Sequence, residues 1–208
     1  MAKMQNEASE QRDGFFFLGN HLALDFLNTK PVLDEVATEL LPDLASILRW
    51  FVSAGLLTQN EANSLLKECD GSASAKAAVQ TIRDFREKLR KVVAGWETGE
   101  RIPRRFLEEL NSHMVDYPLL HRVAIERERS DLEIWFRPSR PESLIGPLAY
   151  EAAKLLTQED SAKVRQCGGC VLHFLDISKK GTRHWCSMRF CGNRNKAAAF
   201  AARQRAAR

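Results

Sequence analysis

The spacing of apolar and polar positions predicts a chain that is mainly helical up to about residue 160. In four segments, which begin after Pro42, at Thr58, near Ser74 and after Pro103, apolar side chains recur every three or four residues. That spacing gathers them on one face of an α-helix, so each segment can bury this face in a common core. Glu61 follows Thr58 by three residues and completes a capping box at the start of the second helix.

The longest of these segments, from about Ser74 to Trp96, carries three arginines outside its apolar set. Arg83, Arg86 and Arg90 are interpreted as solvated side chains on the exposed face of the helix. Binding of an anionic ligand is the alternative for this group of arginines.

A strand and a short helix are expected near the N-terminus. Residues 15–18 form an apolar run typical of a buried strand, and Asn20 then caps a helix that ends near Asn28. His21, Asp25 and Asn28 follow the i, i+4, i+7 spacing of one helix face, which makes them candidate residues for binding a small ligand. The competing interpretation is that this polar stripe meets solvent or caps a neighbouring element.

Between residues 120 and 137 the pattern changes to alternation, which predicts a β-hairpin with its turn at Ser130-Asp131. A last helix is expected to start at Pro147, and the domain boundary lies near Asp160. The fold class is therefore α+β. We expect a disordered lead-in at 1–14, a predominantly helical domain with a small hairpin at 15–160, and a C-terminal module at 161–208.

Charge separates the C-terminal module from the rest of the chain. Of 31 basic and 27 acidic side chains, residues 161–208 hold eleven and one, a net charge of +10. Residues 1–160 hold the other 20 and 26, a net charge of −6. A compact cationic module attracts polyanions, and nucleic acid is the usual one. An ordinary solvated basic tail is the alternative.

The same module holds two cysteine pairs, Cys167 with Cys170 and Cys186 with Cys191, separated by fifteen residues. Four thiolates spaced in this way can occupy the corners of a tetrahedron around one Zn²⁺, and a closed four-sulfur shell marks a structural site. Two disulfides are the alternative. The N-terminus lacks the apolar core of a secretory signal, so we expect a reducing, cytoplasmic location that disfavours disulfides.

The spacing around these cysteines predicts the plan of a treble-clef zinc finger. Residues 171–175 would form the first arm of a small hairpin with Lys179-Lys180-Gly181 at its tip, and Asn193 would cap a final helix that runs to the C-terminus. With four cysteines present, His173 and His184 are not expected to bind the metal.

These motifs also resemble known families. Cys167-x-x-Cys170 and Trp185-Cys186, followed by Cys191-Gly192-Asn193-Arg194, resemble the CGNR zinc finger. Residues 22–29 resemble the opening of the ABATE domain, which commonly precedes such fingers in bacterial stress-response transcription regulators. The resemblance implies a zinc-dependent, DNA-binding transcription regulator whose N-terminal domain senses a small effector or mediates association, homo-oligomerisation included.

In this interpretation the basic side chains of the module contact phosphates. On a helical wheel, Arg194, Arg205 and Arg208 lie near one another, and Lys196 and Arg203 lie on the opposite side, as expected for a helix between the two phosphate walls of a major groove. The candidate nucleic-acid-binding residues are Lys179, Lys180, Arg183, Arg194, Lys196, Arg203, Arg205 and Arg208.

Two other classes of function remain in view. An RNA-binding or ribosome-associated module would use exposed aromatic side chains to stack on unpaired bases. An enzyme would use His21 and Asp25 as an acid/base pair, but no nucleophile elbow, phosphate loop or open metal site accompanies them, so we predict no catalytic activity. No run of eighteen apolar residues is present, and no membrane partner is expected.

Overall fold

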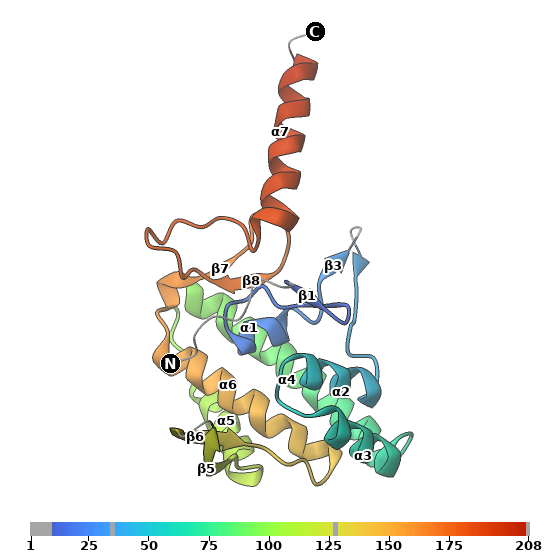
Figure 1. Cartoon of the computed structure of the whole chain (residues 1–208). Helices are drawn as coiled ribbons and strands as arrows, with labels where there is room; N and C mark the ends of the chain where they lie inside the picture. The colour runs from blue at the N-terminus through green and yellow to red at the C-terminus, as the bar shows by residue number, and fades with distance from the viewer. Residues whose placement is uncertain (1–9, 34–35, 127–128, 207–208) are drawn as a thin grey trace.

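A computed structural model describes residues 10–33, 36–126 and 129–206. Its body is a bundle of helices, with the zinc-finger module above it and the last helix pointing away (Figure 1). The helices of the body are α1 (Leu22–Leu27), α2 (Leu44–Ser53), α3 (Gln59–Cys69), α4 (Ala73–Glu97), α5 (Arg104–Asp116) and α6 (Ile145–Gln158), with the short η1 (Pro141–Leu144) before α6. The α+β class expected from the sequence is confirmed.

The expected start signals are found at most of these helices. Thr58 and Glu61 form the complete capping box of α3, and the side chains of Asp43 and Ser72 cap α2 and α4. The helix expected at Pro147 begins two residues earlier. Pro147 fits in its first turn, where a backbone N–H would have no acceptor within the helix.

Aromatic side chains of several helices meet in the centre of the body. Trp50 of α2 is completely buried and packs against Phe26 of α1 and against Phe51. Phe85 of α4 stacks between Phe26 and Phe106 of α5. Aromatic side chains bury large apolar areas, so this cluster fixes how α1, α2, α4 and α5 cross.

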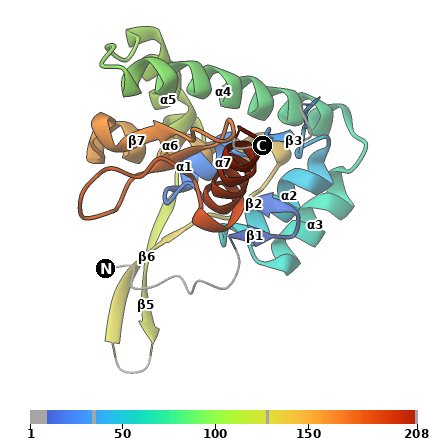
Figure 2. The same cartoon turned by 90° about the horizontal axis from the view of Figure 1, so that it is seen from above.

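Strands in the described residues occur as antiparallel pairs. They are β1 (Gln11–Arg12) with β2 (Phe15–Phe16), β3 (Val32–Leu33) with β4 (Val36–Ala37), β5 (Leu120–Glu126) with β6 (Arg129–Trp135), and β7 (Val164–Gln166) with β8 (His173–Leu175). The β5–β6 pair extends away from the helices (Figure 2).

Two expectations about these strands are wrong. The lead-in is ordered at residues 10–14, because Gln11 and Arg12 pair with Phe16 and Phe15; residues 1–9 lie outside the described part. Ser130 and Asp131 do not form a turn but continue β6, opposite Ile125 and Ala124. An exposed two-stranded ribbon tolerates polar residues in its strands, so their polarity did not mark the turn.

The arginines of α4 are also placed differently from the prediction. Arg86 is 1% exposed and forms a two-point ion pair with Glu39, and its Nη1 also donates to Thr29 Oγ1 over 2.9 Å. Arg83 and Arg90 donate to the backbone carbonyls of Leu41 and Leu27. These side chains therefore join α4 to the end of α1 and to the segment between α1 and α2, and they are not a solvated face.

The C-terminal module packs closely against the N-terminal hairpin and α1. Leu175 of β8 donates its N–H to the Gly19 carbonyl over 2.8 Å, and its carbonyl accepts from Asn20 Nδ2 over 2.9 Å. Asn20 has a φ of +54° and uses its side chain here, so it does not cap α1 as expected. His21 is the cap instead, because its Nδ1 accepts from Ala23 N–H.

Candidate functional site

The four cysteines come together at the base of the last helix. Cys167 follows β7, Cys170 closes the knuckle after it, and Cys191 lies in η3 (Met188–Gly192), a π-helical turn. Their four sulfur atoms all lie within 4.8 Å of one another. The sulfurs of Cys170 and Cys186 are 3.6 Å apart, and those of Cys186 and Cys191 are 3.7 Å apart. A tetrahedron with Zn–S bonds of about 2.3 Å has edges of about 3.8 Å, so the cluster fits one zinc ion.

The backbone around the cluster is arranged for thiolates. Cys167 Sγ accepts N–H groups from Gly169, at 3.4 Å, and from Cys186, at 3.3 Å. A Cβ atom on Gly169 would lie 2.5 Å from the side chain of Asn195 and 3.3 Å from that of Cys191. The absence of a Cβ atom at Gly169 therefore lets the knuckle pack closely against Asn195 and Cys191.

Electrostatics explains why this cluster requires a cation. Hydrogen bonds from Cys170 and Cys186 lower the pKa of the Cys167 thiol. The pKa of Cys170 is raised to about 12, chiefly by its hydrogen bond to Cys167, and that of Cys186 is raised by its hydrogen bonds to Cys167 and Cys170. The Cys167 thiolate thus suppresses ionisation of Cys170 and Cys186, and a bound Zn²⁺ would supply the positive charge that favours their thiolate forms.

The two histidines near the cluster are not part of the group that could hold the metal. His173 is buried, which lowers its pKa to about 4, and its backbone N–H and carbonyl both bond to Asn28. His184 is exposed, and its carbonyl accepts from Gly168 N–H. Within the described residues the group that could hold a metal consists of the four cysteines.

The candidate ligand-binding stripe on α1 has partners inside the protein. Asp25 is buried and accepts from Gly19 N–H over 2.7 Å, and burial raises the pKa of its carboxyl to about 7. The His21 pKa is lowered to about 4, mainly by burial. Asn28 Nδ2 donates to the His173 carbonyl at 3.0 Å, and Asn28 Oδ1 accepts from His173 N–H at 2.9 Å. Asn28 therefore joins the helical domain to the finger, whereas Asp25 and His21 bond to groups within the helical domain.

The hairpin of the finger differs from the predicted one. Strand β8 contains residues of the expected first arm, but it pairs with β7, which precedes the knuckle, and not with a strand after Lys179-Lys180. Those two lysines are exposed in a turn. Arg183 is turned inwards: its Nε donates to the Trp185 carbonyl over 2.7 Å, its Nη2 donates to the Cys186 carbonyl, and its guanidinium stacks over Phe174. Arg183 thus supports the zinc loop, and we remove it from the phosphate-contacting set.

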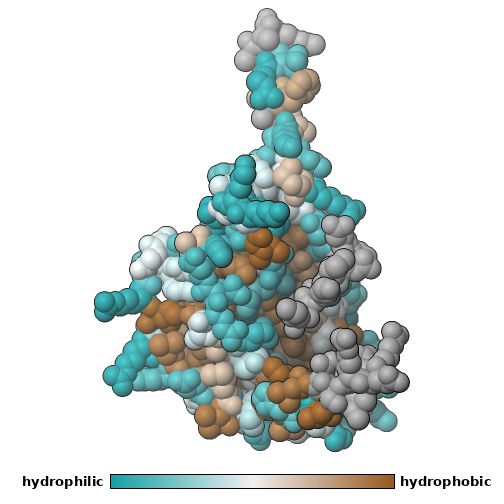
Figure 3. Space-filling model, turned by 60° about the vertical axis from the view of Figure 1, so that its left-hand side comes forward, coloured by the Kyte–Doolittle hydropathy of each residue, from teal (hydrophilic) through white to brown (hydrophobic). Residues whose placement is uncertain are grey.

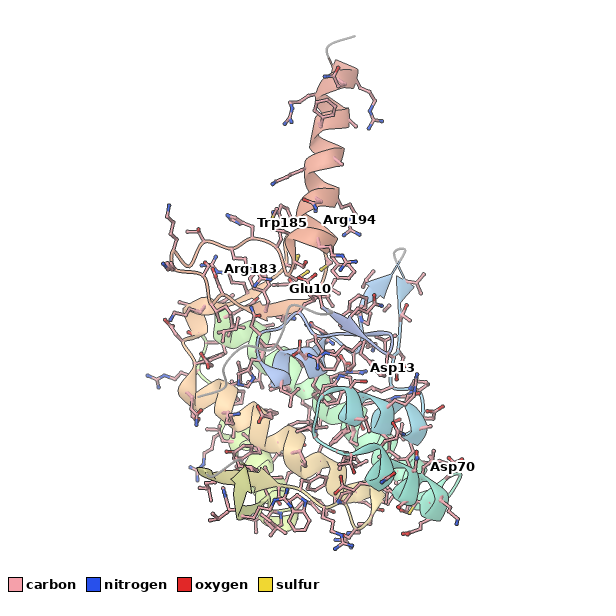
Figure 4. All side chains as sticks on the ribbon, viewed as in Figure 1. Glu10, Asp13, Asp70, Arg183, Trp185 and Arg194 are labelled. Atoms are coloured by element: carbon pink, nitrogen blue, oxygen red, sulfur yellow. The ribbon has the colours of Figure 1, made fainter. Side chains whose placement is uncertain are left out.

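The remaining basic candidates lie on α7 (Asn193–Ala206). Arg194, beside the zinc site in Figure 4, donates from Nη2 to the Gly169 carbonyl over 2.7 Å and lies 3.7 Å from Cys191 Sγ. Lys196, Arg203 and Arg205 are exposed, whereas Arg208 lies outside the described residues. The helix projects from the body (Figure 1), and on the face seen in Figure 3 hydrophilic residues alternate with apolar ones along it.

The cap of this helical segment is a residue that the sequence interpretation missed. Ser187 Oγ accepts from Arg189 N–H over 3.0 Å and donates to Glu10 Oε2 over 2.7 Å, whereas Asn193, the expected cap, already lies inside the helix. A serine directly before a helical run was an available signal. Cys191 is therefore held within a helical turn that continues into α7.

The chain belongs to the ABATE family, described as a putative stress-induced transcription regulator, whose model matches residues 20–159. The CGNR zinc finger matches residues 163–204, which contain all four cysteines. The expected family architecture and the single zinc site are thereby confirmed. No curated protein matches the sequence at a significant level. None of the helices in the described residues is both long and apolar enough to cross a bilayer.

Proposed function

We propose that this protein is a zinc-dependent, DNA-binding transcription regulator in which α7 contacts the nucleic acid and the helical domain holds the finger in position. The observation that carries the proposal is the placement of α7. The helix projects from the body, and its described side chains from Lys196 to Arg205 are exposed (Figure 1). Among the described residues the body covers no face of the outer part of this helix, so all of its sides are available to a partner.

The distribution of charge on α7 fits a groove better than a flat surface. Lys196 and Arg203 lie on one flank, and Arg205 lies on the other. A helix of this kind, about 10–12 Å wide with its side chains, matches a major groove about 12 Å wide. Phosphates line both walls of the groove, so both flanks would form ion pairs there.

The aromatic side chains of the finger favour DNA over single-stranded RNA. Phe174 is completely buried, Trp185 is half-buried, and Phe190 packs edge-to-face on Phe16. Phe200, which is 59% exposed, is the aromatic residue that α7 presents to solvent. Stacking recognition of unpaired bases generally uses several exposed rings, so this surface suits duplex phosphates better.

Selection from a random pool of duplex DNA by the zinc-loaded full chain tests the proposal, and enrichment of a consensus sequence is the expected result. Anisotropy on that consensus then gives the salt dependence of the affinity. Replacing Lys196 and Arg203 together by alanine should lower the log–log salt slope by about 2, and Arg205→Ala should lower it by about 1, because each lost phosphate contact contributes roughly 0.9.

A matched control removes two exposed lysines at the opposite end of the molecule. Lys67 belongs to α3 and Lys76 to the start of α4, elements that lie far from α7 (Figure 1), and the double alanine variant should keep the wild-type salt slope. If Arg205→Ala or the Lys196/Arg203 variant also keeps that slope, only one flank meets the nucleic acid and the groove geometry is wrong. Failure to enrich any duplex, together with tight binding of an RNA pool, would favour the RNA-binding alternative.

A further inference from the structure

A cavity of about 640 Å³ lies between the N-terminal hairpin, β3 and the zinc site. Phe16 and Leu18 line it from the helical domain, and Leu172 and Phe190 line it from the finger. Its volume lies within the range of small-molecule sites, which are usually lined mainly by apolar side chains. Three zinc ligands, Cys170, Cys186 and Cys191, also line this cavity.

The four sulfur ligands differ in how well the protein shields them. Cys167, Cys186 and Cys191 are at most 4% exposed, whereas Cys170 is half-buried. Cys167 does not line the cavity, and its sulfur accepts two backbone N–H groups. Cys191 is covered by the guanidinium of Arg194. Cys170 also has a backbone hydrogen bond, from Leu172, so exposure is what distinguishes it from the other ligands. It is therefore the ligand best placed to meet a molecule in the cavity.

We infer that Cys170 is a modification site for small, uncharged, apolar electrophiles of the α,β-unsaturated carbonyl class. The walls are mainly apolar, so an uncharged molecule suits them better than a charged one, which would lose hydration there. Arg194 also lines the cavity, where its guanidinium is bonded to the Gly169 carbonyl. The Cys170 sulfur attacks the β-carbon and forms an S–C bond. The π electron pair of the alkene moves to the carbonyl as an enolate, and the α-carbon then takes a proton from water and leaves hydroxide. The product is a thioether, and no oxidant or reductant is consumed.

The reaction would change the zinc site, because a thioether is a much weaker zinc ligand than a thiolate. Cys186 and Cys191 lie in the same cluster, and Cys191 belongs to the turn that continues into α7. The adduct is therefore expected to release zinc and loosen the base of α7. An effect on nucleic-acid binding would rest on the proposed function, whereas the modification and the zinc release do not.

The test is treatment of the zinc-loaded full chain with N-ethylmaleimide. Mass spectrometry then measures the labelling of each cysteine, and a chromogenic chelator measures the zinc that is released. Cys170 should be labelled first among the zinc ligands, at a rate proportional to the maleimide concentration and with release of one zinc per adduct. Maleimidoacetate, which carries a carboxylate, should react more slowly at Cys170. Cys69, a half-buried thiol on α3 and not one of the zinc ligands, serves as the internal reference.

Access of the maleimide to Cys170 through the cavity is tested by substitutions in the β3–β4 pair. Val32 lines the cavity and is 39% exposed, so Val32→Trp should narrow it and slow labelling of Cys170 about tenfold relative to Cys69, a barrier increase of about 1.4 kcal/mol. Val36→Trp is the matched control, because Val36 is 64% exposed on the same hairpin and does not line the cavity. Labelling that is independent of maleimide concentration, that reaches a buried cysteine first, or that Val32→Trp leaves unchanged would overturn the inference.

Discussion

Replacing Asn28 by alanine should weaken the attachment of the finger to the helical domain. Asn28 is 1% exposed and exchanges two hydrogen bonds with the backbone of His173, 145 residues further along the chain. Alanine lacks the side-chain amide, so both hydrogen bonds to His173 are lost. The N–H and the carbonyl of His173 then stay buried without a partner, because His173 is itself only 2% exposed.

The expected loss follows from these two groups. Leaving a buried donor or acceptor unpaired costs about 1–3 kcal/mol, so Asn28→Ala should lower the free energy of unfolding by about 2–4 kcal/mol if some water enters. For a chain of this size that corresponds to a fall in Tm of roughly 5–15 °C. The bonds of Leu175 to Gly19 and Asn20 remain, so strand β8 should stay in place below the transition.

Denaturant unfolding followed by circular dichroism measures the change, and hydrogen exchange at the His173 amide localises it. Asn63→Ala is the matched control: Asn63 lies on α3, its exposed side chain accepts from Gln59 over 2.9 Å, and its loss should cost less than about 0.5 kcal/mol. If Asn28→Ala is as stable as Asn63→Ala, water replaces the two bonds without cost, and the proposed clamp between α1 and β8 contributes nothing.

Two further predictions concern the zinc site and the buried carboxyl group. Cys186→Ser should reduce bound zinc well below one per chain and expose the amides after Gln166 to exchange, whereas Cys69→Ser should keep a full complement; a full complement in the Cys186→Ser protein would contradict the assignment. Burial raises the Asp25 pKa from 3.8 to about 7, so the folded protein binds the proton of this carboxyl more tightly than the unfolded chain does. The contribution of protonated Asp25 to the free energy of unfolding should therefore be complete below about pH 4 and be lost as the pH rises to about 7. In Asp25→Asn, whose side-chain oxygen can still accept from Gly19, the free energy of unfolding should lack that decline; an identical pH profile for both proteins would show that the Asp25 pKa is not raised by folding.

The sequence determined those features that depend on local spacing and on the chemistry of single residue types. The zinc ligands could be predicted because four thiolates at these separations have few other stable arrangements. The capped helices α2, α3 and α4 could be predicted because apolar periodicity and cap residues act within one or two turns. The net charge of the C-terminal module could be obtained directly by counting its basic and acidic side chains.

Tertiary structure decided what each polar side chain faces. Arg86 was expected in solvent but is buried against Glu39, and Asn28, a candidate for a ligand site, instead bonds to the backbone of His173 in the finger. Helical periodicity identifies a polar face but not the segment that covers it, because that segment lies far away in the sequence. The exposure of Cys170 to a cavity has the same origin: the walls come from the hairpin at residues 11–18 and from the finger, and only their packing leaves one zinc ligand open while it buries the other three.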